Sequence, residues 1–180
     1  WMASSVIVAD WDRASLQLAE AFGLTFISPV RRSDPVVERK RMLLPMAVEA
    51  GIPFVTPELS GVWDVYPRSV EEGYRGILNV MRHLGMVEGR PVPPKRRITV
   101  GRDPSREVRS PAEGLYVSMK EPGAEVKAGE SLGRLVKTRT PGSIDVESPT
   151  DGIIWRNGKI RRNLVLPSVD RDEVVAEIYE

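Results

Sequence analysis

The sequence contains no cysteine and only one histidine, His83, among its 180 residues. Without cysteine the chain cannot form a disulfide, a thiolate zinc site or an iron–sulfur cluster. A single histidine excludes a multi-histidine metal site built from this chain alone, and a Ser-His-Asp catalytic system would have to use His83. The formal net charge of +1 argues against nucleic-acid binding, which usually requires a strong basic excess.

The sequence also has no apolar run that approaches the roughly 20 residues of a membrane span. The start of the chain, Trp1–Ser5, lacks the basic segment and the apolar core of a secretory signal peptide. Together with the absence of cysteine, these features indicate a cytoplasmic protein with no membrane partner. A tryptophan before the first methionine indicates either an added terminal residue or a chain cut from a longer reading frame.

The first half of the chain alternates between strand-like and helix-like patterns. Short apolar and β-branched runs predict strands at residues 5–9, 24–27 and 52–56. Apolar residues at helical spacing separate these runs. Because strands that alternate with helices are typical of an α/β layer, we expect this fold class for residues 1–90.

The helices of this half have clear stop signals. Gly23 ends the first helix, and Gly51 ends a second helix over residues 37–50, which Pro45 should start, kink or split. A third helix should follow a loop at residues 62–68 and end at Gly85. We expect Glu71–Glu72 to begin this helix and one apolar face to point at the core, formed by Ile77, Leu78, Met81 and Leu84.

A proline-rich connector follows. Residues 87–109 contain four prolines and the basic run Lys95–Arg97, a composition that resists a compact helix. Residues 98–100 could still add one edge strand. The predicted organisation is therefore an α/β part at residues 1–90, a linker at 91–107 and a β domain at 108–180.

The second half contains an internal repeat. Residues 110–115 (SPAEGL) match residues 148–153 (SPTDGI) at an offset of 38, and residues 126–135 (VKAGESLGRL) match residues 169–178 (VDRDEVVAEI) at an offset of 43. Each copy supplies a turn, a strand, a turn and a strand, and two copies related by a pseudo-dyad can close one core. This pattern predicts a small β sandwich or barrel.

The repeat resembles the biotinyl/lipoyl barrel-sandwich hybrid, which implies a carrier lysine on a hairpin tip. The matching position is Pro141, which has no amine to acylate. Lys120 lies in the first repeat copy, before Gly129, and Lys137 is out of register, so we expect both lysines to face solvent. The sequence therefore argues against a working carrier domain.

Two segments of the first half resemble a known protein family. Residues 50–61 (AGIPFVTPELSG), followed by residues 76–86 (GILNVMRHLGM), are similar to the succinylglutamate desuccinylase/aspartoacylase family, and most to its N-acetyl-diaminobutyrate (ectoine-pathway) deacetylase-like branch. The resemblance covers nearly the whole chain in order. It implies a partial zinc carboxypeptidase-like α/β domain followed by an all-β barrel-sandwich-like domain.

The resemblance also implies a division of the chemistry. The family holds zinc through His-x-x-Glu and a later histidine, all upstream of the region present here, so we expect no zinc on this chain alone and place His83 outside the ligand set. Glu58 matches the general base that accepts a proton from water and delivers it to the leaving nitrogen. Trp63, Tyr66 and Arg75 are candidates for substrate binding, since loops that border a site and guanidinium groups suit that role.

These observations predict the C-terminal portion of a zinc-dependent deacylase that hydrolyses an N-acyl amino acid or a similar small molecule. We expect this fragment to be inactive by itself, and homo-oligomer formation remains open. The alternative is a non-catalytic binding or scaffold protein built on the biotinyl/lipoyl-like β domain.

Overall fold

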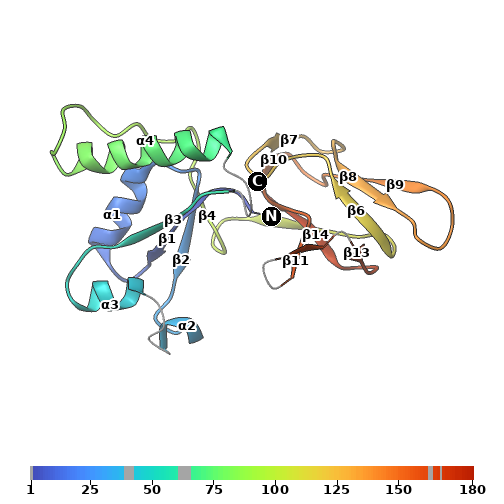
Figure 1. Cartoon of the computed structure of the whole chain (residues 1–180), viewed down its shortest axis with the longest axis horizontal. Coiled ribbons are helices and arrows are strands. Elements are labelled where there is room, and N and C mark those ends of the chain that lie inside the picture. The colour runs from blue at the N-terminus through green and yellow to red at the C-terminus, as the bar shows by residue number, and fades with distance from the viewer. Residues whose placement is uncertain (1, 39–42, 61–65, 162–163, 167) are drawn as a thin grey trace. The chain divides into compact units, whose positions relative to one another are not determined.

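Figure 1 shows the computed structural model of the chain, which describes residues 2–38, 43–60, 66–161, 164–166 and 168–180. The chain divides into two compact units. The first comprises Ser4–Arg102, and the second comprises Asp103–Glu180 together with Met2 and Ala3. Each unit has its own sheets and its own core.

The first unit is built on a four-stranded mixed sheet of order β3-β1-β2-β4. β1 (Ser5–Ala9) lies in the predicted place, whereas β2 (Phe26–Val30) starts two residues later than predicted. β3 (Val55–Glu58) forms only the second part of the third predicted strand and extends to Glu58. The edge strand expected after the prolines is β4 (Ile98–Thr99). β1, β2 and β4 run parallel, while β3 runs antiparallel to β1.

The predictions of the first helix, which ends at Gly23, and of the second helix, over residues 37–50, are confirmed in part. α1 (Arg13–Phe22) is capped by the Asp12 carboxylate at its start and by Gly23, with φ 85°, at its end. The predicted helix at 37–50 is represented by α2 (Pro35–Glu38) and α3 (Leu43–Glu49), and residues 39–42 lie outside the described part. Pro45 lies in the first turn of α3, where a missing backbone N–H costs nothing.

α4 (Pro67–His83) ends as predicted but begins earlier. The Gly85 N–H bonds the Arg82 carbonyl and the Met86 N–H bonds the Met81 carbonyl, which is a Schellman termination around a glycine with φ 70°. The first turn holds no acidic residue because Pro67 starts the helix. The prediction that Glu71–Glu72 begin the helix was therefore wrong.

The predicted buried face of α4 was wrong in part, since Leu78 and Met81 are only half-buried. Ile77 is 60% exposed and Leu84 is 57% exposed, whereas Gly76 and Asn79 are buried. The reason is the close approach of α1: a Cβ at Gly76 would lie 2.1 Å from Cε1 of Phe22. α4 therefore packs on α1 through its small residues, and Phe22 joins the apolar core of the unit beside Val6, Val8, Ala19, Leu24 and Ile27.

The proline-rich segment is fastened to the first unit. The Asn79 side chain is 2% exposed and pairs with the backbone of Val92, as Nδ2 donates to the carbonyl and Oδ1 accepts from the N–H, both at 3.0 Å. Beyond it, β4 buries Ile98 against β2. The border between the two compact units falls after Arg102.

The second unit contains two four-stranded antiparallel sheets. Their orders are β5-β14-β10-β7 and β13-β6-β8-β9, and β11 (Lys159–Arg161) pairs with β12 (Leu164–Leu166) as a separate ribbon. The bounds are β5 Ser105–Arg109, β6 Gly114–Ser118, β7 Glu125–Val126, β8 Ser131–Val136, β9 Ser143–Glu147, β10 Gly152–Asn157, β13 Ser168–Val169 and β14 Val174–Tyr179. Side chains from both four-stranded sheets share one core, including Tyr116, Leu135, Ile154 and Ile178. The described strands form open sheets, so the sandwich alternative holds and the closed barrel does not.

Equivalent hydrogen bonds confirm the internal repeat. The Ser110 hydroxyl donates to the Ala112 carbonyl, and the Ser148 hydroxyl donates to the Thr150 carbonyl, both at 2.6 Å. Residues related by the offset of 38 therefore form the same hydrogen bond in each copy. This turn chemistry reflects the Ser-Pro pair common to both copies.

The second block of the repeat is matched in the same way. The Lys127 N–H bonds Glu130 Oε2 and the Asp170 N–H bonds Glu173 Oε2, both at 3.0 Å. Between these residues, Gly129 has φ 79° and its counterpart Asp172 has φ 65°. Asp172 is the one non-glycine residue with positive φ among those the structure describes, because it occupies a turn that the first copy builds with glycine.

A polar network crosses the core of the second unit. The Tyr116 hydroxyl donates to Asn157 Oδ1 at 2.7 Å, and Asn157 Nδ2 donates to the carbonyls of Lys120 at 2.9 Å and Leu132 at 3.0 Å. Asn157 is 1% exposed, and burial raises the pKa of Tyr116. This network ties β6 and β8 of one sheet to β10 of the other.

Candidate functional site

Glu58 is the last residue of β3, and its position depends on the direction of that strand. In the register of β1 and β3, Glu58 lies opposite Ser5, the first residue of β1. Because β3 is antiparallel, Glu58 lies at the edge where the parallel strands β1 and β2 begin, not at their carboxyl ends. The rule that sites in α/β folds gather at the carboxyl ends of parallel strands therefore does not describe Glu58, which is exposed at the end of its own strand.

The backbone directly after Glu58 is fixed by three serines. The Ser60 N–H donates to Ser4 Oγ at 2.9 Å, and the Ser69 hydroxyl donates to the Ser60 carbonyl at 2.5 Å. The Ser60 hydroxyl lies 3.3 Å from each of the other two hydroxyl oxygens. Ser4 and Ser69 are 8% and 6% exposed. This serine cluster (Ser4, Ser60 and Ser69) joins the start of β1, the end of β3 and the first turn of α4.

The start of β3 is fixed by a fourth serine. The Phe54 N–H donates to Ser15 Oγ at 2.8 Å, and Ser15 is fully buried in the first turn of α1. Ser15 itself is set by the Asp12 carboxylate, which accepts from its backbone N–H at 2.8 Å. With hydroxyl bonds at both ends and the β1 ladder along its length, β3 presents Glu58 from a defined backbone position.

Two of the other predicted site residues lie on or next to α4. Tyr66 is half-buried at the residue that precedes α4, and Arg75 is exposed within the helix. Trp63 lies outside the described residues. Tyr66 is thus the last residue of the connection between β3 and α4. His83 is exposed in the last turn of α4.

Sequence reasoning missed the serine cluster. The three serines are spread over 65 positions, from Ser4 to Ser69, and they share no spacing or motif. Ser60 alone carried a signal, because it follows Glu58 in the segment that resembles the deacylase family. The pairing of the three hydroxyl groups requires the antiparallel return of β3, which no local pattern encodes.

The described residues do not fit a zinc site. Within the described ranges, no group of three or more histidine, cysteine, aspartate or glutamate side chains could hold a metal ion. None of the helices in that part of the chain is both long and apolar enough to cross a bilayer. At the end of β3, the described residues offer the exposed carboxylate of Glu58 on an anchored strand.

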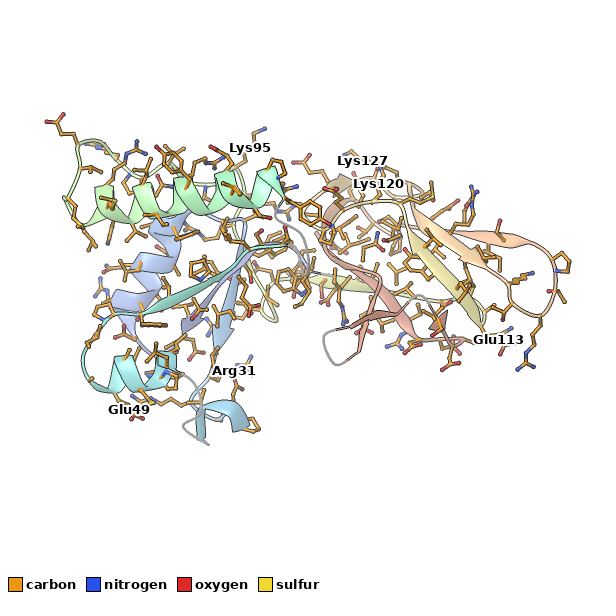
Figure 2. The ribbon with its side chains drawn as sticks, viewed as in Figure 1. Arg31, Glu49, Lys95, Glu113, Lys120 and Lys127 are labelled. Atoms are coloured by element: carbon orange, nitrogen blue, oxygen red, sulfur yellow. The ribbon has the colours of Figure 1, made fainter. Side chains whose placement is uncertain are left out.

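The predicted carrier position is also located. Pro141 lies in the loop between β8 and β9, the hairpin tip at which a carrier lysine was expected. Lys120 lies well away from that tip (Figure 2) and forms an ion pair with Glu130. The nearby Lys127 bonds Asp151 Oδ2 at 2.9 Å. Lys120 and Lys127 therefore each form an ion pair that links turns of the repeat.

The fold is shared with solved structures. Over 99% of this chain, a structure from Rhodobacter sphaeroides described as a succinylglutamate desuccinylase/aspartoacylase matches with 26% identity and a TM-score of 0.63. The ectoine utilization protein EutE (DoeB) from Ruegeria pomeroyi matches over 99% with 20% identity and a TM-score of 0.64. An aspartoacylase family protein from Mesorhizobium loti matches over 98% with 22% identity and a TM-score of 0.58. No family model and no curated protein matches the sequence.

The structural relatives of this chain are succinylglutamate desuccinylase/aspartoacylase proteins. This confirms the resemblance found in residues 50–61 and 76–86. The chain covers 54%, 55% and 57% of the three relatives, so it spans about half the length of the deacylase-family structures that it matches.

Proposed function

We propose that this chain supplies the glutamate-bearing portion of a cytoplasmic, zinc-dependent deacylase that hydrolyses the amide bond of an N-acyl amino acid or a similar small molecule. The observation that carries the proposal is the placement of Glu58. It ends a strand that is anchored at both ends, in a fold shared with deacylase-family structures over nearly its whole length.

The role proposed for Glu58 is proton transfer. A carboxylate within hydrogen-bond reach of a water accepts its proton as the water attacks the amide carbonyl, and the same group then protonates the departing nitrogen. Since Glu58 is exposed at the strand end, water and a small substrate can approach it. The described residues form no ligand set for a metal, so zinc would have to be held by another part of the enzyme.

Three residues are proposed to bind the substrate. The Arg75 guanidinium is exposed on α4 and suits the carboxylate of an amino acid, since its planar donors can bind both oxygens. Tyr66 stands at the start of the same helix. Trp63 is the third candidate, on the sequence pattern alone.

The first experiment measures the isolated chain. We expect the purified 180-residue chain to retain no stoichiometric zinc and to hydrolyse no N-acetyl amino acid. Zinc content by atomic spectroscopy and amine release in the presence of zinc test this directly. Zinc-dependent turnover by the isolated chain would refute the view that it is an inactive portion.

The second experiment tests Glu58 in an active form, obtained by adding the remainder of a deacylase fold. Glu58→Gln should lower kcat by about 100- to 10,000-fold, as expected for loss of a general acid–base group. Glu49→Gln, which changes an exposed carboxylate at the end of α3, should leave kcat unchanged. Equal rates for Glu58→Gln and the unsubstituted protein would reject the proposed role.

A further inference from the structure

The outward face of α4 carries an exposed apolar stripe. Val70 is 55% exposed, Tyr74 61%, Ile77 60% and Leu84 57%. Successive spacings of four, three and seven residues, with half-buried Met81 between Ile77 and Leu84, put them on one side of the helix. We call Val70, Tyr74, Ile77 and Leu84 the α4 stripe.

The α4 stripe is not the surface through which α4 holds to its own unit. That contact uses the other side of the helix, where Gly76 lies against the Phe22 ring. On the same side, Asn79 is hydrogen-bonded to Val92 and its Nδ2 lies 3.4 Å from the Phe22 carbonyl. Figure 1 shows α4 beside α1 in the first unit. The helix is thus packed on one side and apolar on the other, as for a helix that lies between two layers.

The stripe continues toward the candidate general base. Leu59, which follows Glu58, is 38% exposed, and its Cδ1 would lie 2.9 Å from a Cβ placed on Gly73. Gly73 occupies α4 between Val70 and Tyr74, so Leu59 extends the apolar surface along the helix. Whatever covers the α4 stripe therefore lies next to Glu58.

The size of the surface indicates the kind of occupant. Aromatic side chains bury about 150–250 Å² each when fully covered, so five half-exposed residues, four of them smaller and aliphatic, offer at most about 500 Å². A stable interface between two separate proteins buries roughly 800 Å² on each partner. The surface is therefore too small for a self-sufficient dimer contact and fits one part of a larger contact. The solved relatives contain such a further part, since the chain matches only 54–57% of the three described above.

We propose that the α4 stripe, extended by Leu59, is the docking surface for a complementary α/β polypeptide segment, the part of the deacylase fold that the relatives have in addition to the matched half. This inference rests on the proposed function, because docking at this surface would place the added segment beside Glu58. The contact is apolar and needs no metal and no substrate to form.

The test uses the full 180-residue chain and a defined probe. The probe is the part of the Rhodobacter sphaeroides relative outside the matched 54% of that chain, co-expressed as a separate polypeptide and also fused ahead of this chain. We expect a 1:1 complex in co-purification and calorimetry. We also expect slower amide hydrogen exchange in α4 in both the complex and the fusion than in the isolated chain.

Substitutions in the stripe supply the control. Ile77→Asp should weaken the complex at least tenfold and remove the added protection of α4 in the fusion. Val117→Asp, at a residue of β6 with a similar exposure of 52%, should change neither. Far-ultraviolet circular dichroism verifies that each variant remains folded, since both positions are on the surface.

Three outcomes would overturn the proposal: unchanged affinity with Ile77→Asp, no complex and no added protection in either format, or a homodimer of this chain that Ile77→Asp dissociates. The proposed function fails separately. A complex that depends on the stripe but hydrolyses no N-acyl amino acid with zinc would reject the activity while the docking surface stands.

Discussion

The contact between Gly76 and Phe22 makes a quantitative prediction about the first unit. In an exposed helix, Gly→Ala gains about 1 kcal/mol of helix propensity. At Gly76 the new methyl group would lie 2.1, 2.2 and 2.5 Å from three ring carbons of Phe22, a side chain that is only 5% exposed. Overpacking of this kind costs about 1–3 kcal/mol. Because a buried ring has little room to move, we expect the upper end and a net loss of about 1–2 kcal/mol.

The assay is urea unfolding followed by the helical circular-dichroism signal, because all the described helices belong to the first unit. Gly73→Ala is the matched control in the same helix. Its methyl group meets only the end of the Leu59 side chain, at 2.9 Å, so it should be neutral or stabilising. In a Phe22→Leu background, Gly76→Ala should cost much less than in the original chain. A stabilising Gly76→Ala, or the same cost in both backgrounds, would refute the steric reasoning.

Three predictions concern the second unit, measured by thermal and urea unfolding. Asn157→Ala should cost about 3–4 kcal/mol, because the Tyr116 hydroxyl and the carbonyls of Lys120 and Leu132 all lose a hydrogen-bond partner. Tyr116→Phe should cost only about 1–2 kcal/mol, and equal costs would contradict the network. Asp172→Gly should be neutral or stabilising by up to about 1 kcal/mol, because glycine accepts positive φ freely, whereas a clear loss would contradict strain at this turn. The Lys120 hydrogen bond, together with a backbone N–H, lowers the pKa of Glu130. Its stabilising effect is thus present above the unfolded pKa and lost as the pH falls through the folded pKa. Glu130→Gln should therefore lower the melting temperature more at neutral pH than in acid.

The sequence predicted the elements of the first unit better than their arrangement. The buried run at β1 and the glycine stops after α1 and α4 are local signals, and they appear where predicted. The direction of β3 is not local, because it depends on the end of the sheet at which the connection after β2 returns. The segment around Glu58 was enough to make this residue a candidate, but not to predict its position opposite Ser5.

The second unit was easier to predict, because the structure of one copy of the repeat can be inferred from the other copy. A turn built with a serine and a proline in one copy recurs in the other, and the matching hydrogen bonds follow from the matching residues. The Tyr116–Asn157 bond has no counterpart in the repeat pattern, because the two residues come from positions that the offsets do not equate. Such asymmetric contacts become visible only when the two sheets are brought together.

The failed prediction for α4 is itself informative. The apolar spacing of Ile77, Met81 and Leu84 is a correct reading of a helix with a face to bury, yet the contact with α1 is made by Gly76 and Asn79. Two faces of one helix are thus suited to packing, and the described unit uses only one of them. The sequence pattern predicts that this face is buried, and the structure leaves the face exposed. The two agree if a separate layer of the same fold covers the face. That is why the exposed stripe, next to an anchored glutamate, points to a complementary segment rather than to an ordinary solvent-facing helix.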